Sequence, residues 1–146
     1  MLPKNILVPT DLSVEAGLAI DYACELAREL HAKVHLLNVV GLPAIGVPEL
    51  GVAMSATVMD SMIHDNHEAL DKIADAHRGE IGQVLLKTGE ARDVINATAK
   101  ELDADLIVMG THGRTGISRA LLGSIAETVV RTAPCPVLTI HTHPAS

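Results

Sequence analysis

Short runs of consecutive aliphatic residues alternate with segments of helical periodicity along the whole sequence. Runs such as NILV (residues 5–8) and LIVM (106–109) show no alternation of polar and apolar positions. Strands of this kind are buried on both faces, as in a parallel sheet that helices cover on each side. The sequence therefore predicts an α/β fold with a three-layer, open, parallel sheet.

Five strands and four helices are expected in the 146 residues. Strand patterns occupy residues 4–10, 33–40, 81–89, 104–110 and 136–141, and helical patterns occupy 13–30, 51–78, 90–103 and 123–132. Glycine and proline punctuation over 41–50 predicts a loop. The length favours one domain spanning residues 1–146.

Composition argues against nucleic acid and membranes as partners. Eleven basic and eighteen acidic residues give a net charge of −7, and Tyr22 is the only aromatic residue. Nucleic acids are bound through positive charge and stacking platforms, and this sequence has little of either. The apolar runs are too short to span a bilayer, and the amino terminus resembles no signal peptide. Cys24 and Cys135 form no CxxC motif and suit reduced thiols, so a cytoplasmic location is expected.

The stretch GTHGRTGISRALLGSIAE (110–127) contains four of the eleven glycines, Gly110, Gly113, Gly116 and Gly123. It follows the fourth predicted strand and leads into a predicted helix. Ligands of open parallel sheets bind outside the carboxyl ends of the strands. Glycines let the backbone approach such a ligand, and the free N–H groups of a helix start suit an anion.

Each glycine alone is explained by a turn, but the set predicts a ligand that carries phosphate. The hydroxyl of Ser124 would add a donor, and Arg114 and Arg119 are the nearest positive charges in the sequence. The spacing matches neither GxGxxG nor a P-loop. His112 is interpreted as shaping the turn.

The order Gly110-x-x-Gly113, nine residues, then Gly123-Ser124 matches the glycine motif of ATP-binding universal stress proteins. KNILVPTDLS at the start, LLNVV in the second strand and APCPVLTI at the end also resemble that family. The resemblance spans the chain. It implies a Rossmann-like nucleotide-binding fold with strand order 3-2-1-4-5, and ATP with Mg²⁺ as the bound cofactors.

The resemblance also assigns a set of binding residues. Its strand order brings the loop after the first strand beside the glycine loop. The residues implied are Pro9, Thr10 and Asp11 in the first loop, Asp11 and Gly110 at the ribose, the backbone of Val39 with Val40 nearby at the adenine, and Gly113, Arg114, Gly123, Ser124 and Ile125 at the phosphates. From the residues alone, Asp11 fits equally well as a capping carboxylate for the first helix, and Val39 fits the strand core.

These features predict a nucleotide-dependent regulatory or stress-response protein. The alternative is a slow ATPase or a phosphoryl- or nucleotidyl-transfer enzyme on the same fold. Such enzymes need a base, a nucleophile or a group that positions water, and no compelling candidate stands near residues 110–124. No catalytic residue is therefore assigned. A pure interaction module without nucleotide is a further alternative, which the intact glycine motif argues against.

Two further expectations concern assembly and metals. The apolar last strand, PVLTIH, would form a sheet edge and pair with its copy in a homodimer. His64 and His67 stand three residues apart, with Asp60, Glu68 and Asp71 nearby. Because this face is opposite the apolar rows of the predicted helix, it is interpreted as solvated, and no protein metal site is predicted.

Overall fold

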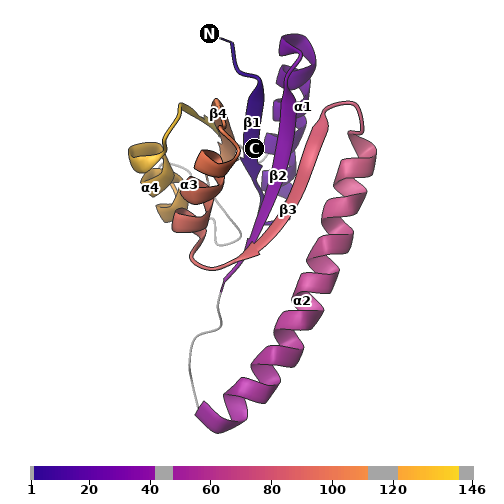
Figure 1. The fold of residues 1–146 in the computed structure, drawn as a ribbon, viewed down its shortest axis with the longest axis vertical. Helices are drawn as coiled ribbons and strands as arrows, with labels where there is room; N and C mark the ends of the chain where they lie inside the picture. Colours follow the sequence, from indigo (N-terminus) through magenta and orange to yellow (C-terminus); the bar gives the residue numbers. More distant parts are fainter. Residues whose placement is uncertain (1, 42–47, 112–121, 142–146) are drawn as a thin grey trace, which may run out of the picture.

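Five parallel strands form one sheet in the order β3-β2-β1-β4-β5 in a computed structural model (Figure 1). The structure describes residues 2–41, 48–111 and 122–141, with the backbone alone for 48–55. The strands are β1 (Asn5–Pro9), β2 (Lys33–Val40), β3 (Ile81–Thr88), β4 (Leu106–Gly110) and β5 (Val137–Ile140); the helices are α1 (Val14–Leu30), α2 (Pro48–Ala76), α3 (Ala91–Glu101) and α4 (Ser124–Thr132). The predicted fold class and strand order are confirmed.

The start of α2 differs from the expectation. The helix begins at Pro48, inside the segment predicted to be a loop over 41–50. Proline fits the first turn of a helix because its missing N–H would have no helical partner there. Figure 1 shows that α2 runs beside β3 and continues past the end of the sheet. Among the described residues, no helix is both long enough and apolar enough to cross a membrane.

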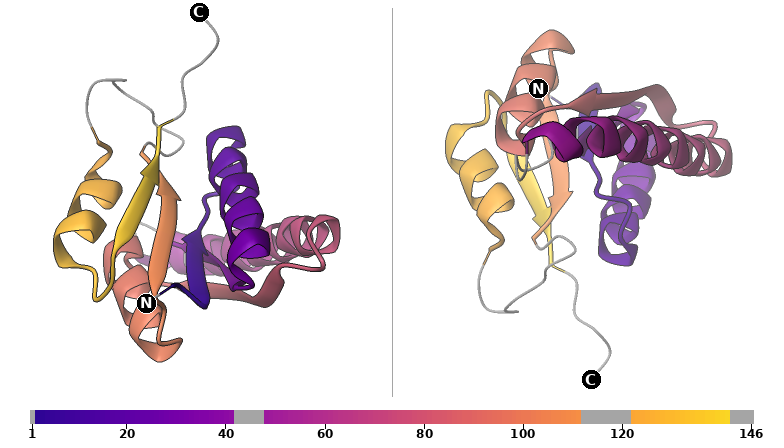
Figure 2. Two further views of the ribbon diagram at one scale, coloured as in Figure 1. Left: turned by 90° about the horizontal axis from the view of Figure 1, so that it is seen from above. Right: turned by 90° about the horizontal axis from the view of Figure 1, so that it is seen from below.

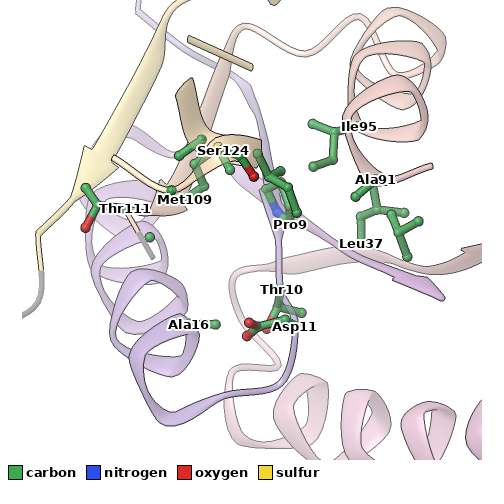
Figure 3. Close-up of a pocket in the computed structure, with 15 residues that line it drawn as sticks. Pro9, Thr10, Asp11, Ala16, Leu37, Ala91, Ile95, Met109, Thr111 and Ser124 are labelled. Carbon is green, nitrogen blue, oxygen red and sulfur yellow. The ribbon is translucent and has the colours of Figure 1, made fainter. Parts of the chain in front are cut away.

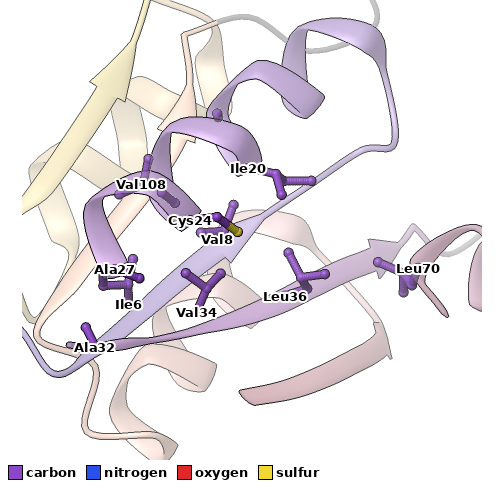
Figure 4. Close-up of a cluster of buried hydrophobic side chains, with 12 residues drawn as sticks. Ile6, Val8, Ile20, Cys24, Ala27, Ala32, Val34, Leu36, Leu70 and Val108 are labelled. Atoms are coloured by element: carbon purple, nitrogen blue, oxygen red, sulfur yellow. The ribbon is translucent and has the colours of Figure 1, made fainter. Parts of the chain in front are cut away.

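α1 and α2 cover one face of the sheet, and α3 and α4 cover the other (Figure 2). Ile6 and Val8 pack beneath α1 in a core that Leu70 of α2 completes at one end (Figure 4). Leu7, between them in the sequence, packs on the opposite face with residues of α3 and α4. Neighbouring positions of β1 thus enter different cores, which explains why its three central residues are all aliphatic.

His35 is a buried polar side chain of β2, with 7% of its surface exposed. Its Nδ1 accepts a hydrogen bond from the backbone N–H of Gln83 at 3.0 Å, so Nδ1 is unprotonated. Its Nε2 lies 3.1 Å from Asn5 Oδ1 and donates to it. At Gly82, an added Cβ would lie 2.7 Å from the ring, so glycine makes room for the imidazole. The neutral ring is built into the sheet, and its burial lowers the pKa of His35.

We expect His35 to make the fold less stable in acid. The folded state lowers the pKa of His35, so the unfolded chain binds more protons below its ordinary pKa of about 6.5. The stabilisation is therefore complete above that pH and is lost as the pH falls toward the folded-state pKa. Urea unfolding between pH 7.5 and 5 should show a steeper loss for the wild type than for His35→Gln, which cannot titrate. Parallel curves for the two proteins would contradict this role.

Candidate functional site

A cavity of about 320 Å³ opens at the carboxyl ends of β1, β2 and β4 (Figure 3). Small-molecule sites in proteins usually have volumes of roughly 300–1,000 Å³. The strand order reverses between β1 and β4, so the cavity lies at the switch point of the sheet. The amino end of α4 completes it.

Most of the predicted binding residues meet at this cavity. Eight line it: Pro9, Thr10, Asp11, Val39, Gly110, Gly123, Ser124 and Ile125. They come from four separate parts of the sequence. Val40, expected nearby, is buried in the core. The predicted residues Gly113 and Arg114, together with His112, Arg119 and Gly116, lie outside the described residues.

The remaining lining residues were not predicted. They are mostly apolar: Ala16, Leu37, Ala91, Ile95, Met109, Thr111 and Ala126. Figure 3 shows Leu37, Ala91 and Ile95 together on the side where α3 packs against the sheet. In the sequence these residues follow ordinary strand and helix periodicity. Only the three-dimensional packing separates a residue that lines the cavity from one that fills the core.

The loop between β1 and α1 forms one wall through local hydrogen bonds. Thr10 Oγ1 accepts from the backbone N–H of Leu12 at 3.0 Å, and Asp11 Oδ1 accepts from that of Ser13 at 2.9 Å. Leu12 has a φ of 66°, in the left-handed region that non-glycine residues rarely adopt. The Ser13 hydroxyl then caps α1 by accepting from the Ala16 N–H at 3.1 Å. Asp11 is therefore a turn-forming carboxylate that also faces the cavity, while Ser13 caps the helix.

The amino end of α4 forms another wall. Gly123 precedes the helix in an extended conformation, and its N–H donates to the Thr111 carbonyl at 2.7 Å. This bond joins the end of β4 to the start of α4. The first N–H groups of a helix have no partner within the helix, and the helix dipole makes this end positive. Since Ser124, Ile125 and Ala126 all line the cavity, this wall suits an anionic group.

The chemistry of the described lining is that of a binding site. Asp11 is the one ionisable side chain among the described residues that line the cavity. Within the described part of the chain, no three His, Cys, Asp or Glu side chains form a cluster that could hold a metal. His64 and His67 instead lie 3.4 and 3.2 Å from the carboxylates of Glu68 and Asp71, on the exposed side of α2. A ligand here would be held by backbone donors, hydroxyls and apolar contacts.

Comparisons with known proteins agree with this architecture. The model of the "Universal stress protein family" matches residues 3–141. The chain is 36% identical over 148 residues to a universal stress protein of Methanocaldococcus jannaschii, covering 95% of this chain and 82% of the relative. It is similar in structure to the universal stress protein UspA from Lactobacillus plantarum, with a TM-score of 0.82, 28% identity and coverage of 94% and 97%. A universal stress protein crystallised in complex with cAMP has a TM-score of 0.68, 22% identity and coverage of 97% and 98%.

Proposed function

Because the chain belongs to the universal stress protein family, we propose that it binds ATP with Mg²⁺ and acts as a nucleotide-dependent regulatory protein in stress responses. The observation that carries this proposal is the cavity at the switch point of the sheet. One of its walls is the amino end of α4 with Gly110 and Gly123, and another is apolar. Such a cavity offers separate environments for the phosphates and the base of a nucleotide.

Each part of ATP has a matching wall. The phosphates would bind at Gly123, Ser124 and Ile125, with Gly113 and Arg114 of the glycine motif completing this subsite. The adenine would lie against the apolar side, near Val39 and Ile95. Asp11 and Gly110 would contact the ribose between them. The cAMP complex of a protein with the same fold supports an adenine nucleotide as the class of ligand.

The negative charge of ATP would be balanced locally, without a basic protein surface. The chain has a net charge of −7, so ATP is not attracted to the protein as a whole. The helix N–H groups supply local positive potential, and Mg²⁺ would neutralise part of the triphosphate. Its oxygen ligands would come from the phosphates, waters and the hydroxyl of Ser124. This donor set fits Mg²⁺, which usually binds proteins through few side chains together with substrate phosphates.

Nucleotide binding would act on the protein by joining two parts of the sheet. The β1–α1 loop and the amino end of α4 stand on opposite sides of the reversal point. A ligand that contacts both the loop and the helix end favours the conformation in which the distance between them fits the ligand. The bound and free forms would then present different surfaces to a regulatory partner.

We also propose that the protein works in the cytoplasm. Cys24 and Cys135 are both free thiols. Burial raises the pKa of Cys24 to about 11, which leaves this group protonated and unreactive at neutral pH. Unpaired thiols suit a reducing compartment.

The binding site is tested by adding a side chain where the phosphates would lie. Gly123→Val should weaken ATP binding at least about tenfold, because a branched side chain at the start of α4 occupies space that the phosphate needs. Gly79→Val is the matched control, since a Cβ there meets no described atom within 4 Å and the residue lies far from the cavity. Isothermal titration calorimetry with MgATP measures both. Equal affinities in the two folded variants would contradict the assignment.

We expect any ATP hydrolysis to be slow. The described lining supplies ground-state contacts and no histidine or lysine to orient water or stabilise charge in the transition state. Turnover should fall below ~0.01 s⁻¹, near that of switch GTPases without their activators, against ~1–10³ s⁻¹ for typical enzymes.

A phosphate-release assay decides this point, with a His112→Ala/Arg114→Ala variant as its control. Turnover near one per second in the wild type that collapses in the variant would establish the alternative function, an ATPase. Slow release that is equal in both proteins supports the regulatory role.

We propose that β5 forms a homodimer interface. β5 is an edge strand whose four residues are all half-buried. The N–H groups of Ile107 and Thr111 donate to the carbonyls of Pro136 and Ile140. Alternate residues of a strand direct their backbone groups to opposite sides, so Thr139 directs its N–H to the open edge. An apolar edge of this kind pairs readily with a copy of itself.

Thr139→Pro should therefore produce a monomer. Proline removes the outward N–H but leaves the hydrogen bonds to β4, because edge strands tolerate it on their open side. Thr139→Val, which keeps the N–H, is the control. Light scattering at about 50 µM, a concentration that populates any dimer of micromolar affinity, should give dimers for the wild type and the control. A monomeric wild type, or a dimeric proline variant, would exclude this interface.

A further inference from the structure

Asn66 interrupts the apolar row by which α2 packs on the sheet. The row contains Met59, Ile63, Asn66, Leu70 and Ile73, spaced by four and three residues in turn, and each is at least half-buried. A polar residue in such a row loses contact with water and needs a partner. The partner of Asn66 is Asn38 of β2: the Asn66 Nδ2 donates to Asn38 Oδ1 at 2.9 Å.

Asn38 also forms a hydrogen bond to Thr10, a residue in the wall of the cavity. Its side chain is buried, with 3% of its surface exposed, and its Nδ2 donates to the Thr10 carbonyl at 2.9 Å. A carbonyl can only accept, so the amide of Asn38 must turn its NH₂ group to Thr10 and its oxygen to Asn66. Asn66 must then present its own NH₂ group. Both amide orientations are fixed by the single backbone oxygen of Thr10.

Hydrogen bonds hold both peptide groups that flank Thr10, where the chain enters the β1–α1 loop. The Thr10 N–H donates to the Leu37 carbonyl at 2.8 Å, and the Thr10 carbonyl accepts from Asn38. In a trans peptide the next N–H points away from the carbonyl, so the Asp11 N–H is directed away from Asn38. The backbone then enters the left-handed turn at Leu12. Asn38 thereby fixes the plane from which Asp11 and the turn continue.

We propose that Asn66 and Asn38 are positioning residues. Through them, the position of α2 on the sheet determines the conformation of the β1–α1 loop, which forms one wall of the cavity. The inference rests on the proposed nucleotide site for its ligand, but the loop geometry that it explains is a property of the protein without ligand. Among the described residues, the hydrogen bond of Asn66 toward the loop runs through Asn38, and Asn38 contacts the loop at a backbone atom. A shift of α2 would therefore change the orientation of Asp11 in the cavity wall, although neither Asn66 nor Asn38 lines the cavity.

Asparagine at positions 38 and 66 makes hydrogen bonds that an apolar residue of similar size could not make. Apolar side chains at positions 38 and 66 would satisfy the packing but leave the Thr10 carbonyl without this donor. A single asparagine in an otherwise apolar helix row can fix the register of the helix at some cost in stability. Here the same two hydrogen bonds would fix both the register of α2 on the sheet and the geometry of the β1–α1 loop.

The first test measures the loop in the protein without nucleotide. Amide hydrogen exchange of Leu12 and Ser13, whose N–H groups bond to Thr10 and Asp11, should accelerate about tenfold in Asn38→Ala and Asn66→Ala. The double variant should exchange no faster than Asn38→Ala, because the two residues act in series. Asn38→Asp, which keeps the shape but sets an oxygen against the Thr10 carbonyl, should loosen the loop as much as alanine does.

The control removes an apolar member of the same row. Ile73 packs against the core beneath α2, so Ile73→Ala should lower global stability. The exchange rates of the loop amides should stay as slow as in the wild type. For this comparison, urea is added to the wild type until both proteins have the same free energy of unfolding. Loop exchange that rises equally in Ile73→Ala and Asn66→Ala would reduce Asn66 to a packing role. Unchanged exchange in the asparagine variants, or additive effects in the double variant, would also overturn the proposal.

The second test links the loop to the ligand. MgATP affinity should fall about five- to tenfold in Asn66→Ala and in Asn38→Ala, and should be unchanged in Ile73→Ala. If the asparagine variants loosen the loop and ATP affinity stays at the wild-type value, the link to the site is overturned. If the wild type itself binds no ATP, the proposed function fails, and the exchange measurements still decide whether α2 positions the loop.

Discussion

The burial of both faces of the sheet is the constraint on which the rest of the molecule depends. Ile6 and Val8 enter one core and Leu7 enters the other, so β1 has no face left for polar chemistry. The same holds for β4, where Val108 and Ile107 point into opposite layers. A parallel sheet covered in this way can bind ligands only at the ends of its strands. The reversal of strand order then selects one place at that edge, between β1 and β4.

This placement determines the kind of chemistry that the site offers. In the loop after β1, the side-chain oxygens of Thr10, Asp11 and Ser13 accept hydrogen bonds from nearby N–H groups, whereas the start of α4 carries N–H groups that its own helix cannot satisfy. Leu37 and Ile95 belong to the core beneath α3 and α4 and extend it to the edge of the cavity. A molecule with an anionic end and a flat apolar part matches these three surroundings. Proteins commonly recognise such a molecule through the backbone, which explains how a chain with a net charge of −7 can hold one.

The strands and their order were predictable from the sequence, whereas the cavity was predictable only in part. Aliphatic runs such as LIVM identify buried parallel strands on physical grounds, and the family resemblance supplied the strand order. Gly110 and Ser124 were placed at this edge because loop glycines and helix-start residues are recognisable in sequence, whereas Pro9 was placed there by the family resemblance. Leu37 and Ile95 were missed because a core residue and a cavity residue have the same periodicity. Pro48 was assigned to a loop because a proline that starts a helix and one that breaks it look alike without the following turn.

The pair of hydrogen-bonded asparagines was beyond sequence reasoning for a different reason. Asn38 lies in the strand LLNVV and Asn66 in the longest helix, 28 residues apart, and neither has a local signal. Their role depends on one carbonyl, that of Thr10, which accepts a hydrogen bond from Asn38, while Asn38 in turn accepts one from Asn66. A buried amide is stable only where all its partners are in place, so it specifies one arrangement of the elements that supply them. In this protein those elements are the helix that covers the edge of the sheet and the loop at the proposed nucleotide site. The nucleotide-dependent regulation that we propose would require such a link, because a partner can respond to ligand binding only if the site is coupled to an outer element of the protein. Under our proposal, Asn66 and Asn38 would supply this link between α2 and the loop.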